Sequence, residues 1–270
     1  MKRLELIVGG ALVGLVLAMA CLSFVWTPFD PTAVLSAAPL QRPGWPHVLG
    51  TDGMGIDILS RVLFGARSAL YVGVIAVGLA ALVGVPLGLL TAQLPRPAAE
   101  VVLRATDIMY AFPALLLAIL LASALGGSTE TAMAAIGIAS IPAFLRVSRA
   151  GALSVLASDF VLAARACGTT RLAITGRHVL PNVAPLIGVQ ASVSFALAIL
   201  AEAALSYLGL GTPPTTPAWG RMLMDAQTYL FVDPLQALWP GLAIAVAVLG
   251  FNLLGDGLRD FLDPRLADVA

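Results

Sequence analysis

The chain has 270 residues, of which 59% are hydrophobic and 11% are charged. An ordinary globular domain carries about 25% charged residues, so this composition excludes a soluble globular domain and indicates a polytopic membrane protein. The 15 basic and 15 acidic residues give a formal net charge of +0, which offers no indication of a nucleic-acid partner.

Six segments are long and apolar enough to cross a bilayer, whose core needs about 20 apolar residues per helix. In chain order they cover residues 6–26, 69–94, 107–126, 130–147, 183–208 and 237–258. Several contain proline, which membrane helices tolerate, so kinks are expected. The G-x-x-x-G spacings at Gly10/Gly14 and Gly84/Gly88 suit close helix packing, although glycine is common in apolar helices. The sequence therefore predicts an all-α protein with six transmembrane helices.

Arginine and lysine are distributed unevenly between the loops on the two sides. If the N-terminus is inside, eleven basic residues lie in inner segments, and four lie in outer segments, namely Arg42, Arg61, Arg67 and Arg221. Cytoplasmic loops carry the excess of basic residues in membrane proteins. The sequence therefore predicts that both termini are cytoplasmic.

Two outer segments are predicted to hold short amphipathic helices. In residues 55–70 apolar side chains recur at helical spacing, and Asp57 precedes Arg61 in the order that favours an i,i+4 ion pair. In residues 211–234 a proline-rich piece precedes a second helix, whose apolar face includes Trp219 and Met222. The pattern leaves open whether these helices anchor the chain at the membrane interface, line a solute path or bind an outer partner.

The segment between the fourth and fifth spans is basic and has helix signals in order. It holds Arg146, Arg149, Arg165, Arg171 and Arg177, with Asp159 as its one acidic residue. Ser158 or Asp159 is expected to cap a helix that begins at Phe160, and Gly168 is expected to end it. Thr169 or Thr170 then caps a second helix, which Pro181 stops.

The first of these two helices has a smooth side, because Ala163, Ala164 and Ala166 lie along it. Another protein surface can therefore approach its backbone closely. Arginine supplies rigid planar donors that suit acidic partners. The segment is thus predicted to be a compact basic element against which a soluble motor protein could push.

This segment resembles the cytoplasmic motif of the permease subunits of ABC importers, E-A-A-x-x-x-G followed after nine residues by I-x-L-P. The matching residues are Ala163, Ala164, Gly168, Leu180 and Pro181. Leu162 and His178 stand where the motif has glutamate and isoleucine. Residues 47–70, 104–119, 201–214 and 252–265 also look like the second-permease branch of the dipeptide, oligopeptide and nickel importers, with Ile56 as a departure.

The resemblance implies a type I ABC importer permease in a bacterial-type inner membrane. Its expected divisions are a first helix with an extracytoplasmic amphipathic segment (1–68), a core permease domain (69–258) with a cytoplasmic coupling loop (148–182), and a cytoplasmic tail (259–270). The chain would form half of a translocation pathway for dipeptides or oligopeptides. Its implied partners are a homologous second permease, two ATPase subunits or one fused ATPase chain, an extracytoplasmic solute-binding protein and membrane lipid.

The chain itself is not expected to be an enzyme or to bind a cofactor or metal; ATP and Mg would bind the ATPase subunits. Lys2 is the only lysine and lies outside any Walker A pattern, so the chain by itself is not a P-loop ATPase. His47 and His178 are expected on opposite sides of the membrane and cannot share a metal. The residues implied in ATPase coupling are Ala163, Ala164, Arg165, Gly168, Arg171, His178, Leu180 and Pro181.

The translocation pathway is assigned to Glu202, Tyr207 and Met222. Glu202 is the one carboxylate inside a well-defined span, where an ionised group is costly and by default a functional candidate. It either lines the path or makes a structural hydrogen bond. Asp107 is expected to pair locally with Arg104.

Three other functions stay open or are disfavoured. A permease for nickel or another small chelated solute belongs to the same transporter class. A proton-coupled secondary carrier would use Glu202 as its proton shuttle. An intramembrane hydrolase is disfavoured, because the sequence has no H-E-x-x-H or G-x-S-x-G motif.

Overall fold

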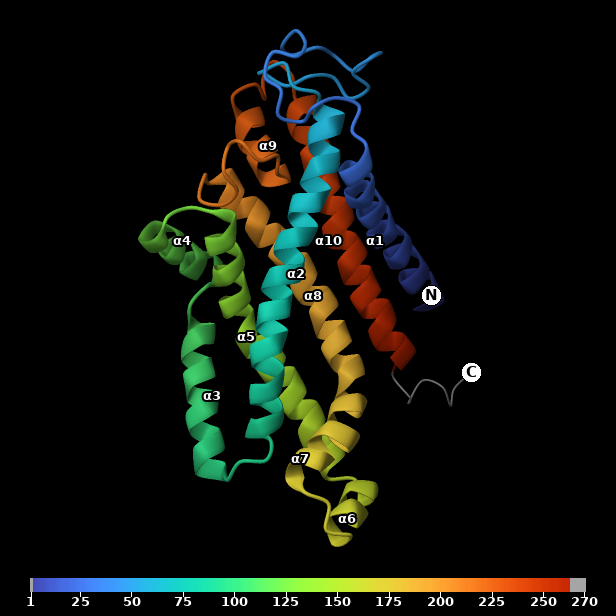
Figure 1. Ribbon diagram of the computed structural model, residues 1–270, viewed down its shortest axis with the longest axis vertical. Helices are drawn as coiled ribbons and strands as arrows, with labels where there is room; N and C mark the ends of the chain where they lie inside the picture. The colour runs from blue at the N-terminus through green and yellow to red at the C-terminus, as the bar shows by residue number, and fades with distance from the viewer. Residues whose placement is uncertain (1, 263–270) are drawn as a thin grey trace.

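The computed structural model describes residues 2–262 as a bundle of helices (Figure 1). Of the predicted tail (259–270), residues 259–262 are the end of helix α10, and residues 263–270, with Arg265, lie outside the described residues. The helices are α1 (Lys2–Val25), α2 (Ile58–Thr91), α3 (Arg96–Ala111), α4 (Ala114–Leu125), α5 (Thr129–Leu156), α6 (Asp159–Ala166), α7 (Arg171–Ile174), the π-helix η1 (Thr175–Val179), α8 (Leu180–Tyr207), α9 (Trp219–Gln227) and α10 (Leu235–Leu262). The prediction of an all-α fold is confirmed.

Five continuous helical segments are long and apolar enough to cross a membrane. They lie in α1, α2, α5, the continuous segment Arg171–Tyr207, and α10. The helices α3 and α4 make a sixth crossing only as a pair, and they are bent by 83° at the break between them. The prediction of six spans therefore holds when this bent pair counts as one.

The third span is not the single helix predicted over 107–126. Phe112 has an extended ψ of 123°, and the next helix starts only after Pro113. Proline has no N–H for the helical hydrogen bond, and it disfavours helical backbone at the residue before it. The chain therefore turns at this position instead of bending gently through it.

The outer amphipathic segment is the first part of α2 and not a separate interfacial helix. The helix starts at Ile58 and runs without interruption for 34 residues, well beyond the roughly 20 that a bilayer core needs. Its outer turns are covered by α9, where Trp219 Nε1 donates to the carbonyl of Val62 at 2.9 Å. The second predicted amphipathic helix is confirmed as α9.

Two apolar clusters that share α2 and α8 form the core. The first joins the inner part of α2 to α5 around residues such as Ala80 and Phe144. The second joins the outer part of α2 to α1, α9 and α10 around Val16, Trp219 and Ala247. The bundle therefore has an inner and an outer half that are packed on different neighbours.

Glycines let α2 and α5 approach closely. A Cβ at Gly84 would lie 2.7 Å from the carbonyl oxygen of Ile141, and a Cβ at Gly88 would meet Ser148. Gly10 and Gly14 have no atom within 4 Å of such a Cβ. The predicted packing role is therefore confirmed for the pair in α2, while the pair in α1 packs on no other helix of this chain within the described residues.

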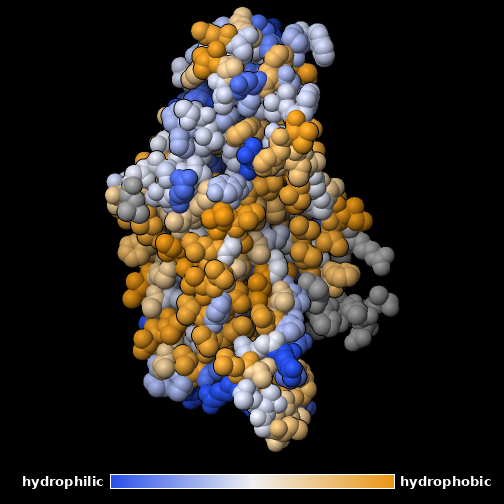
Figure 2. All heavy atoms as spheres, in the orientation of Figure 1, coloured by the Kyte–Doolittle hydropathy of each residue, from blue (hydrophilic) through white to orange (hydrophobic). Residues whose placement is uncertain are grey.

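The surface is apolar over its middle and hydrophilic at both ends (Figure 2). A belt of this kind matches a protein whose middle lies in hydrocarbon. Helices α1 and α10 run antiparallel, with Leu6 against Gly257 and Gly9 against Leu254. The start of α1 and the end of α10 thus lie on the same side of the bundle.

Candidate functional site

Residues 157–179, which we call the inner hook, project from one end of the bundle (Figure 1). Helix α6 has Ser158 at its N-cap position, although the Ser158 hydroxyl donates to Val155 and caps no N–H of the helix. Gly168 follows with φ +80°, a conformation that favours glycine. Thr170 then caps α7 by accepting a hydrogen bond from the N–H of Ala173 at 3.4 Å. The predicted helix, glycine bend and second helix are confirmed.

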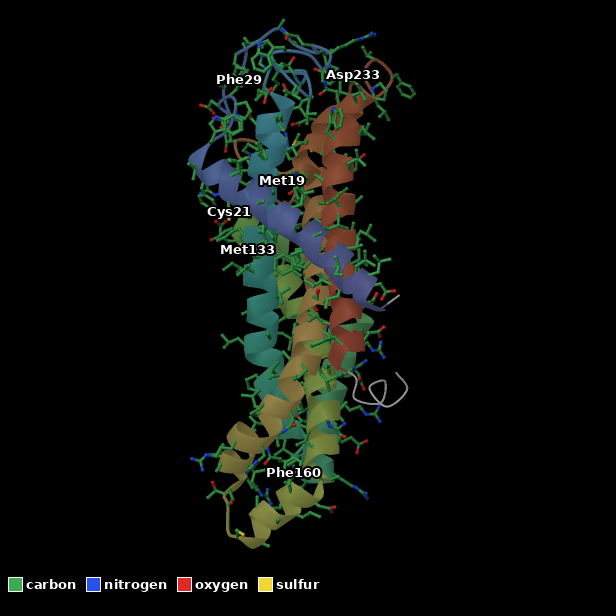
Figure 3. All side chains as sticks on the ribbon, turned by 90° about the vertical axis from the view of Figure 1, so that its right-hand side faces the viewer. Met19, Cys21, Phe29, Met133, Phe160 and Asp233 are labelled. Atoms are coloured by element: carbon green, nitrogen blue, oxygen red, sulfur yellow. The ribbon has the colours of Figure 1, made fainter. Side chains whose placement is uncertain are left out.

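Apolar side chains fasten the inner hook to the rest of the bundle. Val161, Ile174 and Val179 are fully buried and belong to the inner apolar cluster. The rings of Phe160 and His178 meet edge to face with centroids 6.0 Å apart; Figure 3 labels Phe160 at this end of the molecule. The buried Val161, Ile174 and Val179 were not singled out from the sequence, where nothing distinguishes them from the apolar residues beside them.

A polar contact ties the inner hook to a second helix. Gln93, which follows the end of α2, donates from Nε2 to Thr175 Oγ1 at 2.7 Å. The two residues are 82 positions apart in the chain, so nothing in the local pattern predicts the contact. The hook is therefore held by α2 as well as by α8.

Most of the predicted coupling residues lie on the outside of the inner hook. Those exposed are Ala163, Arg165, Gly168, Arg171, Leu180 and Pro181, while Ala164 and His178 are half-buried. Leu172, on α7, is 79% exposed, and Phe160 and Leu162, on α6, are about half exposed. The hook thus presents basic and large apolar side chains together, a surface that suits a protein partner.

Pro181 does not stop a helix, contrary to the prediction. The π-helix η1 leads directly into α8, and the N–H of Leu180 reaches back to the carbonyl of Thr175. Pro181 is the second residue of α8, which directly follows the π-helical turn. Asn182 Nδ2 donates to the carbonyl of His178 at 2.7 Å. The chain consequently stays helical from Arg171 to Tyr207.

A cavity of about 900 Å³ lies between α3, α4, α5 and α8. Its wall is mainly apolar, with Phe112, Leu197 and Leu200 among the side chains. The polar side chains in the wall are Tyr110, Ser140, Arg146, Gln190 and Ser194. The cavity is thus an apolar space that offers polar contacts at a few positions only.

An ion pair joins α3 to α5 at this cavity. Arg146 Nη2 lies 2.8 Å from Asp107 Oδ1, and the guanidinium lies 4.3 Å from the centre of the Tyr110 ring. The expected pair of Asp107 with Arg104 is wrong, because Arg104 lies 3.6 Å from Glu100 instead. The charge on Arg146 therefore belongs to the wall of the cavity.

Glu202 is buried near the outer end of α8 and is bonded to hydroxyl groups. Its Oε1 accepts from Ser206 Oγ at 2.6 Å and from Thr212 Oγ1 at 3.0 Å. Thr212 also donates its N–H to Ser206 Oγ at 2.9 Å. These bonds fasten the turn after α8 back onto the helix.

The three residues assigned to the translocation pathway are not brought together at the cavity. Glu202 is enclosed, Tyr207 is 39% exposed at the end of α8, and Met222 is buried on α9. None of the three is among the side chains that line the cavity. The cavity residues were missed because they come from four helices with no shared motif.

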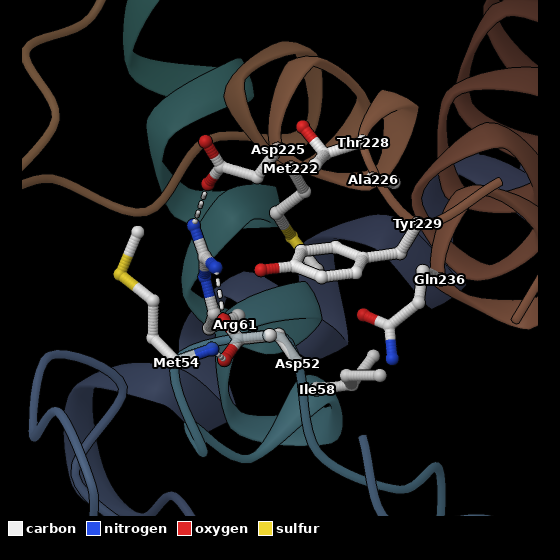
Figure 4. Close-up of a pocket in the computed structure, with 11 residues that line it drawn as sticks. Asp52, Met54, Ile58, Arg61, Met222, Asp225, Ala226, Thr228, Tyr229 and Gln236 are labelled. Carbon is white, nitrogen blue, oxygen red and sulfur yellow. Dashed lines mark hydrogen bonds and ion pairs between the residues drawn. The ribbon is translucent and has the colours of Figure 1, made fainter. Parts of the chain in front are cut away.

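A second, smaller pocket of about 150 Å³ lies at the outer end (Figure 4). Buried Arg61 pairs there with Asp52 and, at 3.0 Å, with Asp225 of α9. The expected pair of Asp57 with Arg61 is wrong: Asp57 accepts from Ser60 and lies 2.9 Å from His47. The Arg61 network therefore ties the outer loop and the start of α2 to α9.

Metal ligands are not gathered anywhere in residues 2–262. No group of three or more His, Cys, Asp or Glu side chains there is placed to hold a metal ion. His47 lies in the outer loop and His178 in the inner hook, at opposite ends of the bundle.

A family model described as the binding-protein-dependent transport system inner membrane component matches residues 84–268. The chain belongs to this family. It is therefore a multi-pass component of a transport system in an inner membrane, and not an enzyme. The match begins within α2 and includes the inner hook and the four helices around the cavity.

Curated relatives cover nearly the whole chain. A di/tripeptide transport system permease protein of Pseudomonas aeruginosa is 42% identical over 97% of this chain and 89% of its own length. A dipeptide transport system permease protein of Alkalihalophilus pseudofirmus is 44% identical over 84% of this chain and 75% of its own. A glutathione transport system permease protein of Pectobacterium atrosepticum is 38% identical over 96% and 87%. The resemblance read from the sequence motifs is thereby confirmed.

A solved structure shares the fold. The MetNI methionine ABC transporter, in an inward-facing conformation, has a chain that matches with a TM-score of 0.62 at 15% identity. The match covers 75% of this chain and 96% of that chain. The described helices therefore have the fold of an ABC importer permease.

Proposed function

We propose that this chain forms half of the translocation pathway of an ATP-driven importer of short peptides. Family and fold make it an ABC importer permease. The peptide substrate is supported by the three relatives above, whose names refer to di- and tripeptides, dipeptides and glutathione. Nickel or another chelated solute is the second candidate in the same class.

The observation that carries the coupling role is the inner hook. It is anchored by buried Val161, Ile174 and Val179, while Leu172 and the nearby arginines point outward. An element that is fixed to the bundle and exposed at its tip can transmit a push from a separate subunit. The ATPase subunits, which bind ATP and Mg, dock here and drive the change of access across the membrane.

The orientation of the bundle in the membrane decides where the remaining partners bind. The hook and both termini are cytoplasmic, as the excess of inner arginines favours, and a solute-binding protein docks at the opposite end. The second permease covers the cavity face, where Phe112, Leu116 and Leu197 are more than half exposed. Residues 69–258 form the core permease domain, with the first helix before it and the tail after it.

Substitution of Gly168 tests the coupling role. Gly168→Val places a β-branched residue at φ +80°, which costs about 1–3 kcal/mol of backbone strain and distorts the hook where the ATPases dock. The matched control is Gly126→Val, because Gly126 has φ +92° and open space around it but lies between α4 and α5. We expect the Gly168 variant to lose ATP-driven peptide uptake, or the ATPases themselves, while the Gly126 variant keeps both.

The measurements are co-purification with the ATPase subunits and peptide-stimulated ATP turnover in proteoliposomes. Wild-type rates of uptake and ATP turnover in the Gly168 variant would contradict the coupling role. Equal losses in both variants would trace the effect to general backbone strain and would also contradict it.

A further inference from the structure

The wall of the cavity contains one charged side chain. Of the residues that line it, all within the described part of the chain, only Arg146 carries a charge. Its counterion Asp107 lies 2.8 Å away on α3. The pair was not expected from the sequence, where Asp107 was expected to pair with Arg104.

The pair lies between two helices of the bundle, toward the end that carries the inner hook. Arg146 lies ten residues before the end of α5 at Leu156, which corresponds to about 15 Å of helix. Helix α5 is long and apolar enough to cross a membrane. Ionisable groups on such helices usually face a cavity or the interior of the bundle, because hydrocarbon solvates them poorly. Arg146 does so, since it lines the cavity.

Arg146 is open to the cavity, whereas Asp107 is not among the side chains that line it. The side chains of Arg146 and Asp107 are 46% and 53% exposed, so neither is sealed in a structural contact. Guanidinium has five N–H donors, and Asp107 takes one of them, at Nη2. The Tyr110 ring supports the guanidinium from one side at 4.3 Å. Arg146 thus has donors left for a second, bidentate partner.

The chemistry of that partner follows from the donor geometry. A guanidinium fork binds a carboxylate through two parallel hydrogen bonds. On α8, Gln190 and Ser194 also line the cavity, and they are joined by a hydrogen bond of 3.0 Å. An amide and a hydroxyl at this place suit the backbone amides of a peptide.

We propose that Arg146 is a binding subsite for the C-terminal α-carboxylate of a peptide in transit, and that Asp107 is the counterion that it exchanges for this carboxylate. The proposal rests on the proposed import of peptides. Asp107 neutralises Arg146 while the cavity is empty, so that no unpaired charge faces the apolar wall of the cavity. The peptide carboxylate then replaces the Asp107 carboxylate at Arg146, and the ion pair between Asp107 and Arg146 forms again when the peptide leaves.

The test compares a free-acid dipeptide with the same dipeptide amidated at its C-terminus. The complete importer is reconstituted in proteoliposomes, and uptake is measured at concentrations that saturate the solute-binding protein with either peptide. The variants are R146Q, R146K and D107N. The control is R104Q, because Arg104 is an exposed arginine on α3, the helix that carries Asp107, and it pairs only with Glu100.

We expect the wild-type preference for the free acid to fall about tenfold in R146Q. The loss of one hydrogen bond to a charged group weakens binding by about that factor. In R146K it falls less, because lysine keeps the charge but loses the fork. D107N and R104Q keep the wild-type preference. If R146Q does not assemble, R146K still decides the question.

Different outcomes overturn different claims. An unchanged preference in the Arg146 variants that assemble, or a wild-type importer that does not distinguish the two peptides, overturns the subsite and leaves peptide import standing. A wild-type importer that takes up neither peptide overturns the proposed function and the subsite with it.

Discussion

Glu202 shows how a buried carboxylate in a span can be structural. Both of its bonding partners, Ser206 and Thr212, are neutral hydroxyls that donate to the same oxygen. The Glu202 side chain closes the turn after α8 and does not reach the cavity. The arrangement favours the structural hydrogen bond among the roles that the sequence left open.

This gives a prediction at Glu202. Glu202→Gln keeps an acceptor oxygen for both hydroxyls, so we expect uptake and stability close to wild type. Glu202→Ala leaves two buried hydroxyls without an acceptor and should lower the free energy of unfolding by about 1–3 kcal/mol. Thermal unfolding of the detergent-purified complex and ATP-driven uptake measure the two effects. Loss of uptake in the glutamine variant alone would support the proton-shuttle hypothesis instead.

Among the features of single residues, the partners in ion pairs are the ones that local sequence predicts worst. Arg61 was expected to pair four residues away, and its partner in α9 is 164 residues away. Asp107 was expected to pair three residues away, and its partner is 39 residues away. Pairs at i,i+4 contribute only about 0.2–0.5 kcal/mol, so tertiary contacts decide which partner a buried charge takes.

At the scale of elements, the contact between α2 and α5 depends on small residues. Gly84 faces the backbone of α5 at Ile141, whereas Gly78, one and a half turns earlier on α2, faces open space. A larger side chain therefore fits at Gly78 and does not fit at Gly84. The two glycines therefore form a matched pair for a test of helix packing.

We expect Gly84→Val to force α2 and α5 apart. It should lower the free energy of unfolding by about 1–3 kcal/mol, since overpacking strains a closely packed contact. Gly78→Val should unfold at the wild-type temperature. The measurement is the thermal unfolding of both variants in the same detergent. Equal unfolding temperatures would mean that α2 and α5 are not this close in the membrane.

The order of elements in the inner hook was predictable, and the effect of individual prolines was not. Thr170 and Gly168 act through local backbone chemistry and mark their boundaries correctly, and Ser158 stands at the N-cap position of α6 without capping it through its side chain. Pro113 breaks its span, while Pro181 lies in the first turn of α8. The difference is that Phe112, before Pro113, has left the helical conformation, whereas Leu180, before Pro181, is helical.

For the whole molecule, the source of energy separates the candidate functions. A carrier driven by protons would work in vesicles that contain this chain alone. An ABC permease needs its ATPase subunits, because no residue of this chain forms a Walker A loop. We therefore expect a proton gradient to drive no peptide uptake by the isolated chain, and ATP to drive uptake by the complete importer. Gradient-driven uptake by the chain alone would contradict the ABC mechanism.

The sequence predicts the class of the whole molecule well and its interior poorly. Hydropathy locates the spans because each must satisfy its own backbone in lipid, and motif spacing identifies the family. The cavity arises where α3, α4, α5 and α8 meet. Its wall depends on the 83° bend between α3 and α4, which no pattern of residue spacing encodes.

The uninterrupted helix from Arg171 to Tyr207 has a mechanical consequence. Its 37 residues make a rod about 55 Å long. Leu172 stands at one end of this rod, Gln190 and Ser194 sit midway along it, and Glu202 pins its far end. Because the helix is not divided at Pro181, a tilt of the end that carries the inner hook reaches Gln190 and Ser194, which line the cavity.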